Sequence, residues 1–256
     1  MLRYLLLCLS ICCYAACSGP QSAKNSATAP PMTNPPAEGF DANGSDAQAI
    51  EIADKVMESM GGRSAWDQTR FIKWTFFGFR TLTWDKLEGR VRIEIPRDSA
   101  VYLVNVFTKQ GKAWEKGQAV TDSDSLALRM KKAESIWIND SYWLVMPFKL
   151  KDSGVTLKHL GEGSTAAGPA ELLELTFKEV GVTPQNKYHV WVDKQTHLVN
   201  QWAFFRNADD PDARFTMPWL DYTPHGEILL SGDRGERKLE NISVSQSMDD
   251  AVFEAL

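Results

Sequence analysis

The chain of 256 residues has very little cysteine, and all of it lies at the N-terminus. The four cysteines are Cys8, Cys12, Cys13 and Cys17. If the segment before Cys17 is removed, the remaining chain has no partner cysteine for an intrachain disulfide and no cysteine-based metal site. We therefore expect a hydrophobic core alone to stabilise the folded part.

The sequence also lacks the patterns that mark common enzymes and nucleic-acid-binding proteins. Acidic and basic residues are scattered, with a net charge of −5 and no basic block, so we expect no nucleic acid partner. It contains no Gly-x-Ser-x-Gly elbow, no His-Glu-x-x-His helix, no phosphate-binding glycine loop and no dinucleotide fingerprint. We expect a protein without catalytic residues or cofactor, and keep a hydrolase with a dispersed site as a distant alternative.

The longest apolar run lies at the N-terminus and indicates export. Arg3 precedes the apolar residues 4–14, and two alanines precede Cys17. The run is shorter than the ~20 residues that a membrane-spanning helix needs, and the arrangement is typical of a secretory signal peptide. Tyr14-Ala-Ala-Cys17 resembles the bacterial lipobox, although Tyr14 replaces the usual leucine.

The lipobox resemblance implies cleavage after residue 16 and attachment of fatty acyl chains such as palmitate to Cys17. Stable anchoring needs more than one lipid chain, which a triacylated cysteine supplies. By analogy with enterobacterial lipoproteins, Ser18 implies the outer membrane, on either its periplasmic or its surface face. The alternative is a plainly secreted protein.

The rest of the chain divides into a tether and one domain. Residues 17–44 are rich in Pro, Ser, Ala and Asn and have almost no large apolar side chain, so we expect them to be disordered. Residues 45–256 are mildly acidic and rich in aromatics, and the whole chain has nine Trp and twelve Phe. This length suits a single β-rich domain.

Hydrophobic periodicity predicts two main helices and many strands. Ser45 and Gln48 form a possible capping box before an apolar stripe that ends at Gly61-Gly62. A helical turn is expected at 64–67, and a helix at 123–135 capped by Asp122 or Ser123. Period-two alternation predicts strands at 71–79, 81–84, 90–95, 101–107, 155–160, 172–180, 188–193, 198–206, 214–222, 227–230 and 237–246. We predict a mainly β (α+β) fold, an open, curved antiparallel sheet or incomplete β-barrel covered by a few helices.

Three segments carry a resemblance to a known superfamily. They are the aspartate-initiated hairpin 192–199, VDKQTHLV, the run 136–150, IWINDSYWLVMPFKL, and the segment 181–188, GVTPQNKY. The chain from Asp46 to Phe253 resembles the LolA/LolB-like superfamily of lipoprotein carriers and receptors, and a group of uncharacterised bacterial envelope proteins. The resemblance implies a half-open barrel whose apolar interior holds acyl chains beneath helices, and it implies no catalytic residues. The receptor's protruding apolar loop has no clear counterpart here.

Aromatic residues are the candidate binding residues. We expect them on the inner face of the barrel, where they would line a cavity suited to a lipid or acyl chain. The alternative is that they fill a packed core, in which case the protein would be an envelope interaction protein. The candidates are Trp74, Phe76, Trp84, Trp137, Trp143, Trp191 and Trp202.

Histidines offer little for a metal site. His189 and Asp193 share one face of a strand and His197 follows the turn. A metal site would need three ligands supported by further hydrogen bonds, so we expect none.

Overall fold

The computed structural model describes residues 33–178 and 181–256. The predicted signal peptide and the lipidation site Cys17 lie outside the described residues. Residues from Thr33 onward belong to one compact unit. Within it, the N–H of Ala37 donates to the carbonyl of Lys151 (3.0 Å) and that of Asp41 to the carbonyl of Val155 (3.0 Å). Residues 34–44, expected in the tether, are therefore hydrogen-bonded to the domain.

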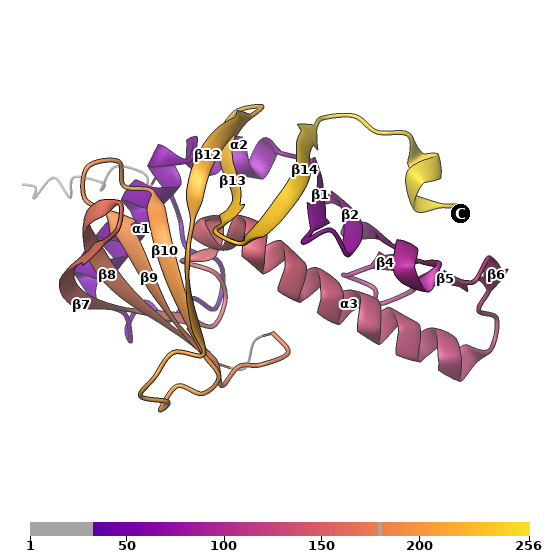
Figure 1. Ribbon diagram of the computed structural model, residues 1–256, viewed down its shortest axis with the longest axis horizontal. Helices are drawn as coiled ribbons and strands as arrows, with labels where there is room; N and C mark the ends of the chain where they lie inside the picture. The colour runs from indigo at the N-terminus through magenta and orange to yellow at the C-terminus, as the bar shows by residue number, and fades with distance from the viewer. Residues whose placement is uncertain (1–32, 179–180) are drawn as a thin grey trace, which may run out of the picture. The chain divides into compact units, whose positions relative to one another are not determined.

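The unit contains three α-helices and fourteen strands within the described residues (Figure 1). The helices are α1 (Ala47–Ser59), α2 (Gly62–Gln68) and α3 (Ser123–Val145), with 3-10 turns η1 (Pro96–Asp98), η2 (Met146–Lys149) and η3 (Asp250–Phe253). The strands are β1 (Phe71–Phe76), β2 (Arg80–Asp85), β3 (Arg90–Ile95), β4 (Ala100–Asn105), β5 (Gly111–Glu115), β6 (Gln118–Ala119), β7 (Val155–Thr165), β8 (Gly168–Phe177), β9 (Lys187–Asp193), β10 (Val199–Phe205), β11 (Phe215–Pro218), β12 (Leu220–His225), β13 (Ile228–Arg234) and β14 (Arg237–Ser245).

One bent strand joins the two antiparallel sheets of the structure. Nine strands pair in the order β12-β13-β14-β1-β2-β3-β4-β5-β6, and five in the order β11-β10-β9-β8-β7. Trp219 alone separates β11 from β12, and its N–H donates to the carbonyl of Asn200 on β10 (2.9 Å). The edge strands β6 and β7 do not pair with each other in the described part of the chain. The predicted fold class, an open antiparallel sheet covered by a few helices, is confirmed.

The strand β3 shows how the sequence sets the two faces of the sheet. Val91, Ile93 and Ile95 are buried, while Arg92 and Glu94 between them are half-buried on the other face. Successive side chains of a strand point to opposite faces. The alternation therefore places one apolar face of the sheet against the helices.

Helix α1 is capped one residue later than predicted. Its N-cap is Asp46, and Ser45 instead donates its hydroxyl to the carbonyl of Asp41 and accepts from the N–H of Leu157. The capping-box prediction is therefore wrong, because tertiary contacts with β7 hold the Ser45 hydroxyl. The apolar stripe itself is confirmed: Ala49, Ile52, Ala53, Val56 and Met57 are buried at helical spacing.

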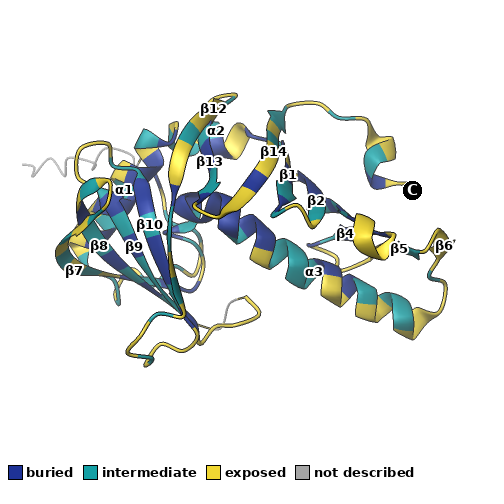
Figure 2. Cartoon of the chain, viewed as in Figure 1, coloured by how far each residue is buried: buried dark blue, intermediate teal, exposed yellow. Residues whose placement is uncertain are grey.

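Helix α3 extends ten residues beyond the predicted end at Ser135. Asp122 caps it as expected, accepting from the N–H of Ser125 (2.8 Å). The first half packs one side on β4 and β5, but the last turns are buried on several sides and contact β13 (Figure 2). Such all-round burial produces no single apolar stripe in the sequence. The helix continuation at 136–145 was missed for this reason.

Candidate functional site

Six of the seven aromatic candidates meet where α3 faces the sheet. Trp74 and Phe76 of β1 and Trp84 of β2 share the inner face with Trp202 of β10, and α3 supplies Trp137 and Trp143. Ring centroids are 5.4 Å apart between Trp84 and Trp137, 6.2 Å between Phe76 and Trp143, and 4.7 Å between Trp143 and Trp202. The fold thus brings together residues that are distant in sequence.

The seventh candidate, Trp191, lies on the opposite face of the five-stranded sheet. Its strand neighbours Val190 and Val192 are buried on the inner face, so Trp191 points outward, beside the outward-facing His189. Trp191 therefore takes no part in the inner aromatic cluster.

The inner aromatic cluster is a packed interior. Trp74, Phe76, Trp84, Trp143 and Trp202 are each no more than 8% exposed. They fill the space between helix and sheet. Any ligand that reaches them must therefore enter beside a helix that already covers the sheet.

A cleft of about 380 Å³ lies between α1 and the sheet, within the usual size range of small-molecule sites. Its floor is apolar: Ile52 and Val192 are buried and belong to the main hydrophobic core. Its rim is charged and polar. The lining residues are Ala47, Gln48, Glu51, Ile52 and Lys55 of α1 together with Glu171, Val192, Lys194 and His197.

The predicted aspartate-initiated hairpin carries two rim residues. The Asp193 carboxylate accepts from the N–H groups of Gln195 and Thr196 (3.0 and 2.7 Å), which fixes the turn. The turn places Lys194 and His197 at the cleft, and His197 adopts a left-handed backbone with φ of 57°. A side chain–backbone turn of this kind is what an aspartate at a hairpin favours.

The rim combines charges of both signs. Lys55 pairs with Glu51 (2.8 Å), and Lys194 lies 3.5 Å from Glu171. Lys55 holds the pKa of the Glu51 carboxyl below its ordinary value, and Glu162 with Glu171 raises the pKa of Lys194. The cleft therefore has an apolar floor beneath a charged rim.

Several polar groups in the interior have no hydrogen-bond partner among the described residues. They are the indole nitrogens of Trp74, Trp84, Trp137, Trp202 and Trp219, the Tyr142 hydroxyl, both amide atoms of Asn200, and Nε of Arg234. Buried polar groups are nearly always paired in proteins, so such a concentration calls for an explanation. Asn200 and Arg234 were not among the candidates, because nothing in their local sequence pattern distinguishes them.

Arg234 holds the end of α3 against β13. Its Nη2 donates to the carbonyl of Trp143 (2.7 Å) and to that of Ser231 (3.0 Å), and its guanidinium carbon lies 3.3 Å from the centre of the Trp219 ring. Burial lowers its pKa to about 9, so the group is still charged at neutral pH. The carbonyl end of a helix favours a cation, which explains why Arg234 is tolerated at 1% exposure.

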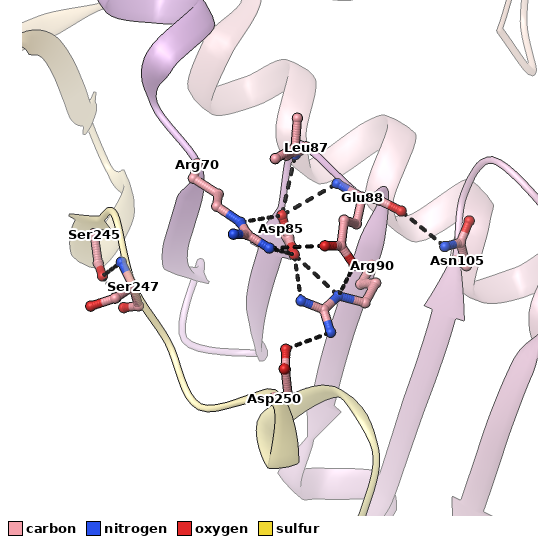
Figure 3. Close-up of polar contacts among 9 residues, drawn as sticks. All are labelled: Arg70, Asp85, Leu87, Glu88, Arg90, Asn105, Ser245, Ser247 and Asp250. Atoms are coloured by element: carbon pink, nitrogen blue, oxygen red, sulfur yellow. Dashed lines mark hydrogen bonds and ion pairs between the residues drawn. The ribbon is translucent and has the colours of Figure 1, made fainter.

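A second polar cluster, on the outer face, is structural (Figure 3). The buried Asp85 carboxylate accepts from Arg70 and Arg90 and from the N–H groups of Leu87 and Glu88. Its pKa is lowered, because these hydrogen bonds outweigh its desolvation. All its acceptor positions are used, so the cluster fixes the β2–β3 turn and offers no reactive group.

The histidines form no catalytic constellation in the described part of the chain. His159 pairs with Glu171 (2.7 Å), His189 with Glu174 (3.2 Å), and His225 with the Thr223 hydroxyl (3.0 Å). The side-chain partners of these three histidines are two glutamates and a threonine, and residues 33–178 and 181–256 hold no group of His, Cys, Asp and Glu with the geometry of a metal site. None of the described helices has the length and apolarity to cross a bilayer.

Comparison with known proteins gives likenesses in structure only. No family model matches the chain, and no curated protein matches it. Similar solved structures include a DUF1329 family protein from Desulfovibrio piger, with 14% identity over 80% of this chain and 97% of that chain and a TM-score of 0.45. A domain described as outer membrane lipoprotein-sorting from Vibrio parahaemolyticus has 9% identity, coverage of 80% and 96%, and a TM-score of 0.42. A LolA superfamily protein from Nitrosomonas europaea, with 10% identity, coverage of 81% and 97% and a TM-score of 0.42, is also similar. The resemblance expected from the sequence is thus found among the structural neighbours.

Proposed function

We propose that this protein is a non-catalytic lipoprotein, anchored in the outer membrane through Cys17, that binds an acyl chain or similar lipid between α1 and the sheet. The observation that carries the proposal is the cleft whose floor, Ile52 and Val192, is part of the main hydrophobic core. An acyl chain that enters there moves directly from a polar rim onto apolar side chains. The inner aromatic cluster lies deeper in the same core.

The energetics suit binding without any reactive group. Burial of each methylene contributes about 0.8 kcal/mol, so ten buried methylenes contribute about 8 kcal/mol before the costs of association. A chain that is only partly enclosed would therefore bind in a useful range. The anchor and the N-terminal tether would keep the cleft within reach of membrane lipids.

The proposal is tested by native mass spectrometry of the full chain purified from cell envelopes, followed by organic extraction. We expect a co-purifying acyl lipid. Gln48→Trp places a bulky side chain at the exposed mouth of the cleft without altering the core, so it should remove most of the bound lipid. Glu58→Trp is the matched control, because Glu58 is also exposed on α1 but does not line the cleft. An apo mass that takes up no added fatty acid or phospholipid contradicts the proposal.

A second candidate function is favoured by the tight packing of the interior. Leu87 in the β2–β3 turn and Phe107 after β4 are 69% and 64% exposed, and a side-chain carbon built on Gly89 would collide with the Phe107 ring, so the two turns are neighbours. Exposed apolar groups at one end of the sheet suit a protein partner. In that case Leu87→Ser and Phe107→Ser would abolish partner capture and leave lipid content unchanged.

A further inference from the structure

The side chain of Asn200 is buried, and no described residue pairs with its amide. It is 7% exposed, and neither Nδ2 nor Oδ1 has a hydrogen-bond partner among the described residues. An amide can donate two hydrogen bonds and accept two. A leucine, whose side chain has a similar branched shape, would fill an apolar interior without unpaired polar atoms, so the amide requires an explanation beyond packing.

Asn200 follows Val199, the strand partner of a residue on the floor of the cleft, and does not itself line the cleft. On the β9–β10 ladder Val199 pairs with Val192 and Gln201 pairs with Trp191, so Asn200 is the extra residue of a β-bulge between these pairs. Val192 lines the cleft. Bulges often occur next to functional sites, where they redirect a side chain.

Three further donors without a partner in the described part of the chain lie near Asn200, each in Trp219 or in a residue that contacts it. The backbone N–H of Trp219 donates to the backbone carbonyl of Asn200 (2.9 Å). The centroids of the Trp202 and Trp219 rings are 5.4 Å apart, and the Arg234 guanidinium covers the Trp219 ring. Within residues 33–178 and 181–256, neither indole nitrogen has a hydrogen-bond partner, and the Arg234 Nε has none either. With Asn200 Nδ2 this makes four donors without a partner in the described part of the chain. Two acceptors in the same neighbourhood also have none there: the Asn200 Oδ1 and the Tyr142 hydroxyl, whose ring lies 6.4 Å from that of Trp202. The excess of donors suits a ligand group that carries oxygen acceptors.

We propose that Asn200, Trp202 and Trp219 form an interior polar subsite that binds the carboxyl oxygens of an acyl ligand whose chain occupies the cleft. This inference rests on the proposed function and deepens it, because it selects acyl carboxylates and esters over plain hydrocarbons. Arg234 adds positive potential to the subsite, while its Nη atoms stay on the backbone carbonyls at the end of α3. The competing account is that buried water alone satisfies these donors.

The test compares ligands that differ only in the carbonyl group. Methyl dodecanoate and dodecyl methyl ether would be used to displace a dansyl-labelled fatty acid from the purified full chain. We expect the ester to bind about 5- to 10-fold more tightly than the ether, the effect of one net hydrogen bond in a buried site. Dodecanoate, in a third arm, distinguishes the two possible forms of the acyl ligand. If dodecanoate binds more tightly than the ester, the ligand is a free fatty acid. If it binds equally or more weakly, the ligand is an esterified chain.

The decisive variant is Asn200→Leu. It should keep the affinity for the ether and lose the preference for the ester, whereas Gln201→Leu, next in the chain and paired on the outer face, should keep that preference. If Asn200→Leu does not fold, Trp202→Phe removes one indole donor while retaining an aromatic ring, and should lower the preference in part.

Three results separate the possibilities. If wild type binds ester and ether equally, or if folded Asn200→Leu keeps the full preference, the subsite is wrong and the lipid-binding proposal stands. The water account predicts either of these two results, because the ligand carbonyl then makes no contact with Asn200. If neither ligand nor the dansyl probe binds, the proposed function fails and the subsite fails with it.

Discussion

The ion pair between Arg80 and Asp140 should respond very differently to the loss of each partner. Arg80 on β2 donates two hydrogen bonds to the Asp140 carboxylate on α3, at 2.5 and 2.7 Å. The Asp140 side chain is fully buried, while Arg80 is 24% exposed and lies over the Phe76 ring. Burial raises the pKa of Asp140 even though Arg80 and Asn139 act to lower it.

Arg80→Met leaves a buried carboxylate with only Asn139 as a side-chain partner, so we expect it to lower the free energy of unfolding by about 3–5 kcal/mol at pH 7. Asp140→Leu leaves an arginine that can reach water, and should cost only about 1 kcal/mol. The double variant should lie within about 1 kcal/mol of wild type, because no unpaired buried charge remains. Urea denaturation of the four proteins gives these values and the coupling energy.

The penalty in Arg80→Met should depend on pH with a definite sign. Without Arg80 the folded-state pKa of Asp140 lies still further above its unfolded value, so the folded state binds the proton more tightly. Stability lost at neutral pH should therefore be regained as the pH falls through that raised pKa. Equal costs for the two single variants, or a pH-independent penalty, would refute the reasoning.

Three further predictions concern other parts of the fold. Arg129 holds the pKa of Glu115 at about 2, so the stability that this pair contributes should be present above pH 4.5 and lost as the pH falls from 4.5 toward 2, which acid titration of wild type and Glu115→Gln would show. Gly61→Ala should destabilise by ~3 kcal/mol or more, because φ is 109° and a side-chain carbon would lie 2.2 Å from a backbone oxygen, whereas Gly62→Ala meets only the left-handed strain of about 1 kcal/mol; thermal unfolding compares them. Trp202→Ala should cost about 3–5 kcal/mol in chemical denaturation, because the ring is 1% exposed within the inner aromatic cluster.

Local patterns in the sequence predicted the strands better than the helices. The range 90–95 is reproduced as β3, because its clean alternation leaves only one way to bury the apolar face. The predicted strand 214–222 is instead β11 and the start of β12, divided at Trp219. A bend of this kind depends on pairing with β10 on one side and β13 on the other, which the local sequence does not encode.

The candidate site was predicted only in part. The aromatic content pointed to the interior, yet Trp191 has the same residue type as Trp202 and faces the other way. Trp191 alternates along β9 with the buried Val190 and Val192, whereas Trp202 pairs with Val190. Asn200 and Arg234 gain their significance from neighbours that are far away in the sequence. Burial and the absence of a partner are tertiary properties, so no local spacing could reveal them.

The most direct measurement of the central claim is a crystal structure of the protein with a bromine-labelled fatty acid, located by the anomalous signal of bromine. The account predicts a chain that runs between α1 and Val192, with its carboxyl group within hydrogen-bond distance of Asn200 or of the indole nitrogens beside it. A bromine signal confined to the outer surface, near Leu87 and Phe107 for example, would contradict it.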